Sequence, residues 1–289
     1  MRRGSVVATM ALAAGWLAIQ PLPTMAQTAT DLRNEKIVVD YYEPRDPRFQ
    51  PLYERLQKRR VLEELSQFLA PVRWPKTLRM IMKECPSSGV SWPQVFYSKI
   101  EYSLTICYQW FAALRSLKPP PPAFATQQEV IVGGLVGIVL HQSAVAIFDM
   151  LSVPRLGSDD DAADQISAFV GLQFGPEVAR AVIKGTYYIW KTYDDLYVDN
   201  NYQYDFAARA SVPRQRMYNT LCMAYGGAPA IFKSFVDQAN LLPAARAETC
   251  DEEYRQVQAA FRKTIVPRVD SDKMTTVRSM TWLSPDDLK

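Results

Sequence analysis

The single histidine of the chain, His141, lies inside a long uncharged stretch, and imidazole is the commonest metal ligand among side chains. Zinc peptidases carry the helical motif H-E-x-x-H, in which two histidines bind zinc and the glutamate acts as the base. Here the glutamate position holds Gln142 and the second histidine position holds Val145. An amide cannot take a proton near neutral pH. The pattern therefore predicts no catalytic residue and no tightly bound cofactor at these positions.

Carboxylates follow shortly after this stretch, and Asp159, Asp160 and Asp164 are the remaining candidate metal ligands beside His141. One imidazole and a short carboxylate give two ligands at best, whereas catalytic zinc needs three. A helix start explains the same acids, because negative charge in a first turn meets the helix dipole. Asp160 and Asp164 repel each other at this spacing unless a cation such as Arg216 lies between them. His141 itself is equally compatible with a buried histidine bonded to a neighbouring group.

The helix that must position His141 runs from residue 129 to 151, with no charge between Glu129 and Asp149. That length is sufficient to cross a membrane. Polar side chains at its centre and acidic flanks favour instead a helix buried on all sides of a globular core. We expect no membrane span in the mature chain.

The remaining elements predict a helix-dominated α+β fold. Short alternating segments indicate a small N-terminal sheet, which the short connections suggest is antiparallel. Amphipathic periodicity predicts the helices. The expected strands are 36–42, 78–83, 94–97 and 102–107, and the expected helices are 51–69, a segment from 108, 129–151, 160–174, 176–197, 213–225, 228–240 and 244–265.

Residues 1–26 have the pattern of a secretory signal, with Arg2 and Arg3 before an apolar stretch and Ala26 at the cleavage point. We therefore expect a bacterial protein exported to the periplasm or the medium, with one domain over 27–267 and a loose tail over 268–289. Without the two arginines the chain is close to neutral, so nothing in its charge favours nucleic acid.

Four cysteines in an exported chain suggest two disulfides, and three pairings are possible. We favour Cys85–Cys107 and Cys222–Cys250, because each pair brackets one local unit. Four reduced, buried thiols are the alternative.

Several stretches together carry a resemblance to a known family. They are Pro154 to Gln165 after the central helix, Leu104 to Tyr108, and Gln215 to Asn219. The chain resembles a bacterial family of zincin-like metallopeptidases of unknown function over about residues 36 to 267. The resemblance implies a zincin-like fold, in which a helix with H-E-x-G-H-A precedes a segment P-x-x-G-x-E-E-D-A-A-D-Q.

The chain departs from this family pattern at the residues that would bind the metal or act as the base. The resemblance implies glutamate where the chain has Gln109 and Gln142, and histidine at Val145 and near Ala210. We therefore expect an inactive member that binds a peptide or protein in the former cleft. The alternative is a metal-dependent peptidase whose site is rebuilt from His141 and nearby carboxylates around zinc. The aromatic segment 187–206 could add a peptide or glycan surface, or could simply pack a helix.

Overall fold

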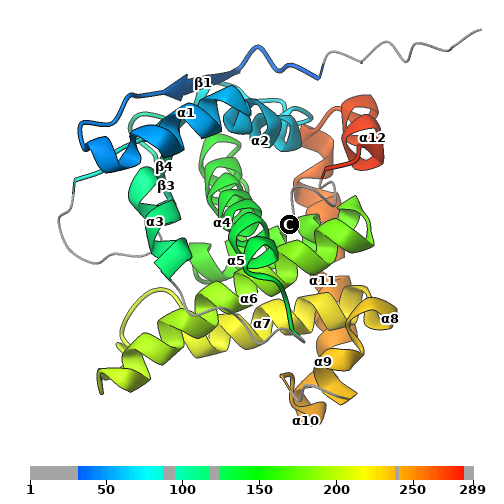
Figure 1. The fold of residues 1–289 in the computed structure, drawn as a ribbon. Coiled ribbons are helices and arrows are strands. Elements are labelled where there is room, and N and C mark those ends of the chain that lie inside the picture. Colours follow the sequence, from blue (N-terminus) through cyan, green and yellow to red (C-terminus); the bar gives the residue numbers. More distant parts are fainter. Residues whose placement is uncertain (1–31, 87–94, 117–123, 238–240, 283–289) are drawn as a thin grey trace, which may run out of the picture. The chain divides into compact units, whose positions relative to one another are not determined.

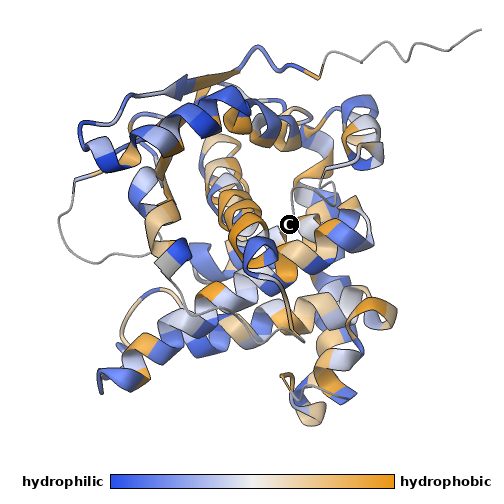
Figure 2. Cartoon of the chain, in the orientation of Figure 1, coloured by the Kyte–Doolittle hydropathy of each residue, from blue (hydrophilic) through white to orange (hydrophobic). Residues whose placement is uncertain are grey.

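The uncharged stretch forms most of α4 (Gln127–Met150), the helix on which the other elements pack in this computed structural model. Thr126 and Glu129 form a capping box that fixes its start. Residues buried along α4 lie on all sides of it, and Figure 2 shows it orange over much of its length. Residues 32–86, 95–116, 124–237 and 241–282 are described here.

Only α4, among the described helices, is long and apolar enough to cross a membrane by length and composition. Of the window that meets this criterion, 78% is buried inside the fold. Burial of this kind is what a central core helix requires.

The helix α6 (Pro176–Asp199) makes the most extensive helix contact with α4, and Figure 1 shows the two crossing. Glycines permit the close approach. A Cβ on Gly133 would lie 1.8 Å from the carbonyl oxygen of Ala181, and one on Gly185 would lie 2.2 Å from the backbone nitrogen of Gly134. The helices α5 (Asp159–Gly171), α7 (Pro213–Gly227) and α11 (Cys250–Thr264) complete this helical part.

The sheet confirms the α+β class, but it is mixed rather than antiparallel. Its strands β1 (Ile37–Tyr41), β2 (Leu78–Lys83), β3 (Val95–Ser98) and β4 (Ser103–Cys107) lie in the order β1-β2-β4-β3. Both pairings of β2 are parallel, and only β3 runs antiparallel to β4. The expectation of an antiparallel sheet was wrong because two helices form a crossover between β1 and β2, and because β3 folds back at the outer edge.

Three of the expected helices are interrupted, and one of them, 228–240, contains the two short helices α8 (Pro229–Phe232) and α9 (Ser234–Asp237). The segment 51–69 divides into α1 (Gln50–Lys58) and α2 (Val61–Leu69) at Arg60, whose φ of 55° ends the regular helical geometry. The segment 244–265 divides into α10 (Ala244–Ala247) and α11. The other described elements are η1 (Pro47–Phe49), α3 (Tyr108–Ser116), η2 (Leu172–Phe174), η3 (Val266–Arg268) and α12 (Ser271–Ser279).

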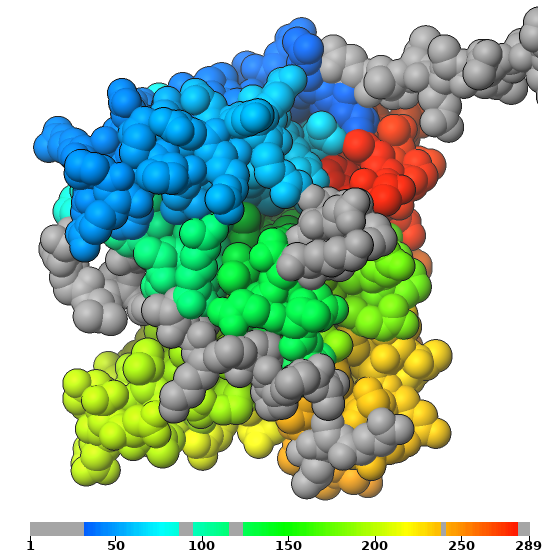
Figure 3. Space-filling view, viewed as in Figure 1, coloured from blue at the N-terminus to red at the C-terminus, as the bar shows by residue number. Residues whose placement is uncertain are grey.

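The C-terminal segment is not loose as far as residue 282, which corrects the expectation from sequence. Val269 forms a bridge with Val72, and α12 follows it. Trp282 is 4% exposed and its ring stacks on Phe68 with centroids 3.8 Å apart. Figure 3 shows the blue surface of α1 and α2 beside the red C-terminal surface. The expected signal at 1–26 and the proline run at 119–122 lie outside the described residues.

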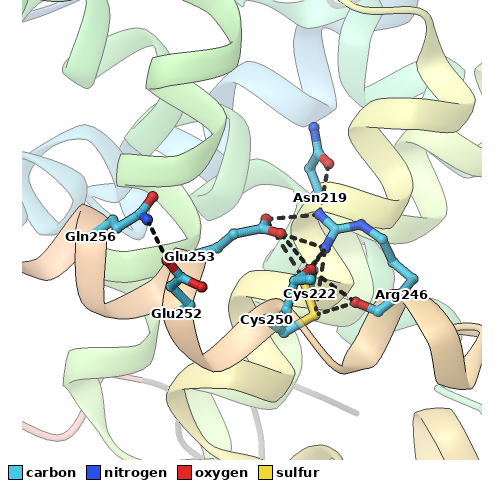
Figure 4. A network of polar contacts seen from close by, with 8 residues as sticks. Asn219, Cys222, Arg246, Cys250, Glu252, Glu253 and Gln256 are labelled. Atoms are coloured by element: carbon cyan, nitrogen blue, oxygen red, sulfur yellow. Dashed lines mark hydrogen bonds and ion pairs between the residues drawn. A yellow bond between two sulfur atoms is a disulfide. The ribbon is translucent and has the colours of Figure 1, made fainter.

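The two disulfides of the structure are the favoured pairs. Cys85 is bonded to Cys107 at the end of β4, and Cys222 of α7 is bonded to Cys250 at the start of α11. Beside the second bond, Arg246 donates to both carboxylate oxygens of Glu253 at 2.6 and 2.8 Å (Figure 4). This network joins α7, α10 and α11.

Candidate functional site around His141

His141 is 3% exposed on α4, and its two ring nitrogens face two carboxylates of α5. Nδ1 lies 2.8 Å from Oδ1 of Asp164. Nε2 lies 3.6 Å from Oδ1 of Asp160. The one-turn spacing of the two aspartates places both on the face of α5 that meets α4.

Arg216 reaches the same aspartate from α7. Its Nε lies 2.5 Å from Oδ2 of Asp164, and its Nη2 lies 2.9 Å from Oδ1. The guanidinium also lies over the ring of Trp190 of α6, 3.6 Å from the centroid. A planar, permanently charged group suits both contacts, whereas a lysine could make neither fully. Side chains of four helices therefore meet at one buried ion network.

The charges of this network balance one another. Burial lowers the pKa of His141, but Asp164 and Asp160 outweigh it, so the net direction is upward. Burial raises the pKa of Asp164, but Arg216 and His141 outweigh it and the pKa is lowered. The polar interaction with the nearby ring of His141 is the main cause that lowers the pKa of Asp160. These shifts favour the charged forms of His141, Asp160 and Asp164.

The donors of this network do not fit a catalytic zinc site. Arg216 bonds both oxygens of Asp164, and His141 Nδ1 bonds one of them as well. Only Nε2 of His141 and the carboxylate of Asp160 remain, and Val145 supplies no ligand atom one turn further on. Within the described ranges, no group of three or more His, Cys, Asp or Glu side chains could hold a metal ion. Zinc catalysis needs three protein ligands and an open position.

Gln142 and Gln109, which stand where the resemblance implies glutamate, both bond to backbone. Oε1 of Gln142 accepts from the backbone N–H of Tyr97 in β3 at 2.9 Å. Gln109 accepts from the N–H of Cys85 at 3.1 Å and donates to the carbonyl of the same residue at 2.9 Å. A glutamate at position 142 could still accept from Tyr97. A glutamate at position 109 could not donate to the carbonyl of Cys85, because an ionised carboxylate has no donor.

Asp159, a sequence candidate for a metal ligand, bonds surface cations instead. Its carboxylate accepts from Arg155 and lies 3.5 Å from Arg209 and 3.8 Å from Lys99. The hydrogen bond from Arg155 is the main cause that lowers its pKa. The structure therefore brings Asp160 and Asp164 to His141, but not Asp159.

The start of α5 also has the capping role considered from the sequence. The hydroxyl of Ser158 accepts from the N–H of Asp161 at 3.4 Å. Asp161 in turn accepts from the hydroxyl of Ser211 at 3.0 Å, next to Ala210. The sequence did not predict that Trp190 contacts the ion network. It indicated only that Trp190 belongs to an aromatic segment on the helix before the one that carries Arg216.

The aromatic segment divides between core and surface. Tyr187, Tyr188 and Trp190 are buried within α6. Beyond that helix, Tyr202 is 65% exposed and Phe206 is 83% exposed. Core packing explains the aromatic residues at 187–190, whereas Tyr202 and Phe206 are exposed enough to contact a ligand.

A core helix thus carries histidine at the first position of the zinc motif, and an acidic helix follows it. The family model DUF4344, described as "Putative metallopeptidase", matches residues 41–265, and the chain belongs to this family. No curated protein and no solved structure matches the chain.

Proposed function

We propose that the chain is a non-hydrolytic member of its metallopeptidase family, in which an ion network replaces the metal centre. The observation that carries this proposal is the double hydrogen bond between Arg216 and Asp164 beside His141. The guanidinium and the imidazole ring together compensate the buried carboxylate of Asp164 without a metal cation. A metal ion on Nε2 of His141 would bring a further positive charge beside a carboxylate that is already paired.

The residues around His141 also lack the groups that hydrolysis requires. Metallopeptidases use the metal to lower the pKa of a bound water to about 7, and a general base to take its proton. Gln142 has no basic atom, and its amide oxygen is held by the N–H of Tyr97. Around His141, the described residues supply neither three metal ligands nor a base at the position of Gln142.

The remaining capacity of the cleft would be to bind an extended peptide along β3. This strand is one of the two edge strands of the described sheet, and the N–H of Tyr97 donates to Gln142 rather than to β4. A peptide that added a strand would take this hydrogen bond by displacing the glutamine side chain. The same contact would hold a peptide or protein ligand without cutting it.

Peptide binding is tested with a fluorescently labelled, permanently unfolded polypeptide such as reduced, carboxymethylated lactalbumin. We expect saturable binding, and tighter binding to Gln142→Ala, because that change frees the N–H of Tyr97. The matched control is Gln128→Ala, on the same helix away from β3. Absence of binding to both the wild type and Gln142→Ala would contradict this role.

A rebuilt metal site is the second candidate function. Its supporting observation is the 3.6 Å separation between Nε2 of His141 and Oδ1 of Asp160. Two ligands about 2.1 Å from one zinc ion in tetrahedral geometry lie roughly 3.4 Å apart. This candidate requires zinc that is lost in both His141→Ala and Asp160→Asn, together with peptide hydrolysis that follows the zinc content.

Export to an oxidising compartment is part of the proposal. Both disulfides are compatible with the periplasm or the extracellular medium, where such bonds persist. The expected signal at residues 1–26 is tested by N-terminal sequencing of the protein from a periplasmic fraction, which should begin at Gln27.

A further inference from the structure

A second site lies on the other side of α4, in a cavity of about 540 Å³ between α4, α5, α11 and α12. Ordinary voids in protein interiors are hardly larger than a water molecule. Sites for small molecules have volumes of about 300–1,000 Å³. The cavity therefore has the size of a ligand site.

The interior of this cavity is mostly apolar, and two of its polar side chains, Ser143 and Gln173, bond to backbone carbonyls. Leu140, Ala144 and Ile147 line it from α4. The hydroxyl of Ser143 donates to the carbonyl of Val139 at 2.6 Å. The side-chain amide of Gln173 donates to the carbonyl of Phe169 at 3.0 Å. Apolar walls of this kind offer water few hydrogen-bond partners. The site therefore favours an apolar occupant.

The rim of the cavity is positively charged. Of the described residues that line it, Arg262 of α11 and Arg278 of α12 are the exposed ones. Neither guanidinium has an ion pair or hydrogen bond with another described side chain. Guanidinium groups bind carboxylates with paired, charge-assisted hydrogen bonds. An apolar interior beneath two exposed arginines complements a molecule with a long hydrocarbon chain and one anionic end.

We propose that this cavity binds a long-chain fatty acid, with the chain inside and the carboxylate at Arg262 and Arg278. His141 leaves α4 on a different face from Leu140, Ser143, Ala144 and Ile147, which are spaced for one side of the helix. The fatty-acid site is therefore separate from the ion network and does not depend on the proposed loss of hydrolysis.

The test uses the delipidated full chain and cis-parinaric acid, whose fluorescence rises in apolar surroundings. We expect saturable binding of one molecule per chain. Arg262→Gln with Arg278→Gln should weaken binding of the acid about tenfold or more, and should change binding of its methyl ester less than twofold. The control Arg255→Gln with Lys263→Gln removes two charges of α11 outside the cavity and should leave both affinities unchanged.

A second variant tests the interior. Ala144→Phe places a ring where the chain would lie, so it should abolish binding of both the acid and the ester while the protein keeps its helical circular-dichroism spectrum. The proposal is overturned if the delipidated wild type shows no saturable signal. It is equally overturned if folded Ala144→Phe binds as the wild type does, or if the rim variant weakens acid and ester alike.

Discussion

At the scale of single residues, Arg216 is the side chain on which the buried network depends most. It donates two hydrogen bonds to Asp164 and lies over Trp190. His141 alone could not compensate both neighbouring carboxylates, because it carries at most one positive charge. Removing one partner of such a buried pair costs more than the pair contributes when intact, because the other charge is left without compensation.

We predict that Arg216→Met lowers the free energy of unfolding by about 3–5 kcal/mol. Arg216→Lys should recover only part of this, since an ammonium group cannot make the paired contact or stack on the indole. Urea denaturation measures both values. The control Arg180→Met changes an exposed arginine of α6 and should have little effect. A loss below about 1 kcal/mol for Arg216→Met would contradict the network.

The pH dependence of stability follows from the same residues. The raised pKa of His141 stabilises the fold fully below its unfolded value of about 6.5, and this stabilisation is lost as pH rises through the folded pKa. The lowered pKa values of Asp160 and Asp164 stabilise the fold above about 3.9, and this is lost as pH falls through their folded values. We predict that stability attributable to the network is greatest between these limits.

Because His141 is the only histidine, its ring signals are unambiguous once any histidine tag is removed. NMR titration should show the ring still protonated above pH 6.5, and His141→Gln should remove the decline in melting temperature on the alkaline side. A ring that deprotonates at or below its ordinary pKa would contradict the assigned direction.

At the scale of elements, the side chains of two glutamines form hydrogen bonds with the backbone of segments far away in the sequence. Gln142 joins α4 to β3, and Gln109 joins the start of α3 to the segment after β2. Their demands differ, because the first contact needs only an acceptor and the second needs an acceptor and a donor.

We predict that Gln109→Glu destabilises the protein by about 1–3 kcal/mol, because the carbonyl of Cys85 loses its donor and faces a negative charge. Gln142→Glu is the matched comparison and should cost less than about 1 kcal/mol, since a carboxylate still accepts from Tyr97. Thermal unfolding of both variants measures the difference. Equal costs, or the reverse order, would contradict these roles.

The existence of most elements could be predicted from sequence, whereas their pairing could not. The strand at 78–83 and the long helix near 129–151 follow from local periodicity, which the sequence contains directly. The parallel pairings of β2 depend on a helical crossover. Arg216 meets Asp164 although the two are 52 residues apart. Contacts of that kind are decided by packing, and only the mutual repulsion of Asp160 and Asp164 indicated that a cation was needed.

At the scale of the whole molecule, the C-terminal segment belongs to the fold although its sequence is polar. Asp270 caps α12, the backbone N–H of Arg73 donates to the carbonyl of Arg268 at 2.9 Å, and Trp282 packs on Phe68. One buried tryptophan anchors a helix whose own apolar periodicity is weak, which is why the sequence indicated a loose tail.

We predict that Trp282→Ala lowers the free energy of unfolding by about 3–5 kcal/mol, the usual cost of removing a large buried aromatic side chain. Limited proteolysis should then cut within 268–282 before any other described segment. Val198→Ala is the control, because that apolar side chain is 57% exposed. If Trp282→Ala were as stable as the control, Trp282 would not anchor the C-terminal segment, and the expectation of a loose tail would hold.

Zinc binding by the purified, untagged chain tests the central claim most directly. Titration of zinc into the wild type, followed by elemental analysis after dialysis, should show no tight stoichiometric metal. Gln142→Glu with Val145→His on the same helix should gain zinc affinity, because it restores a two-histidine face. One zinc ion per wild-type chain that survives dialysis and disappears in His141→Ala would contradict the replacement of the metal centre by an ion network.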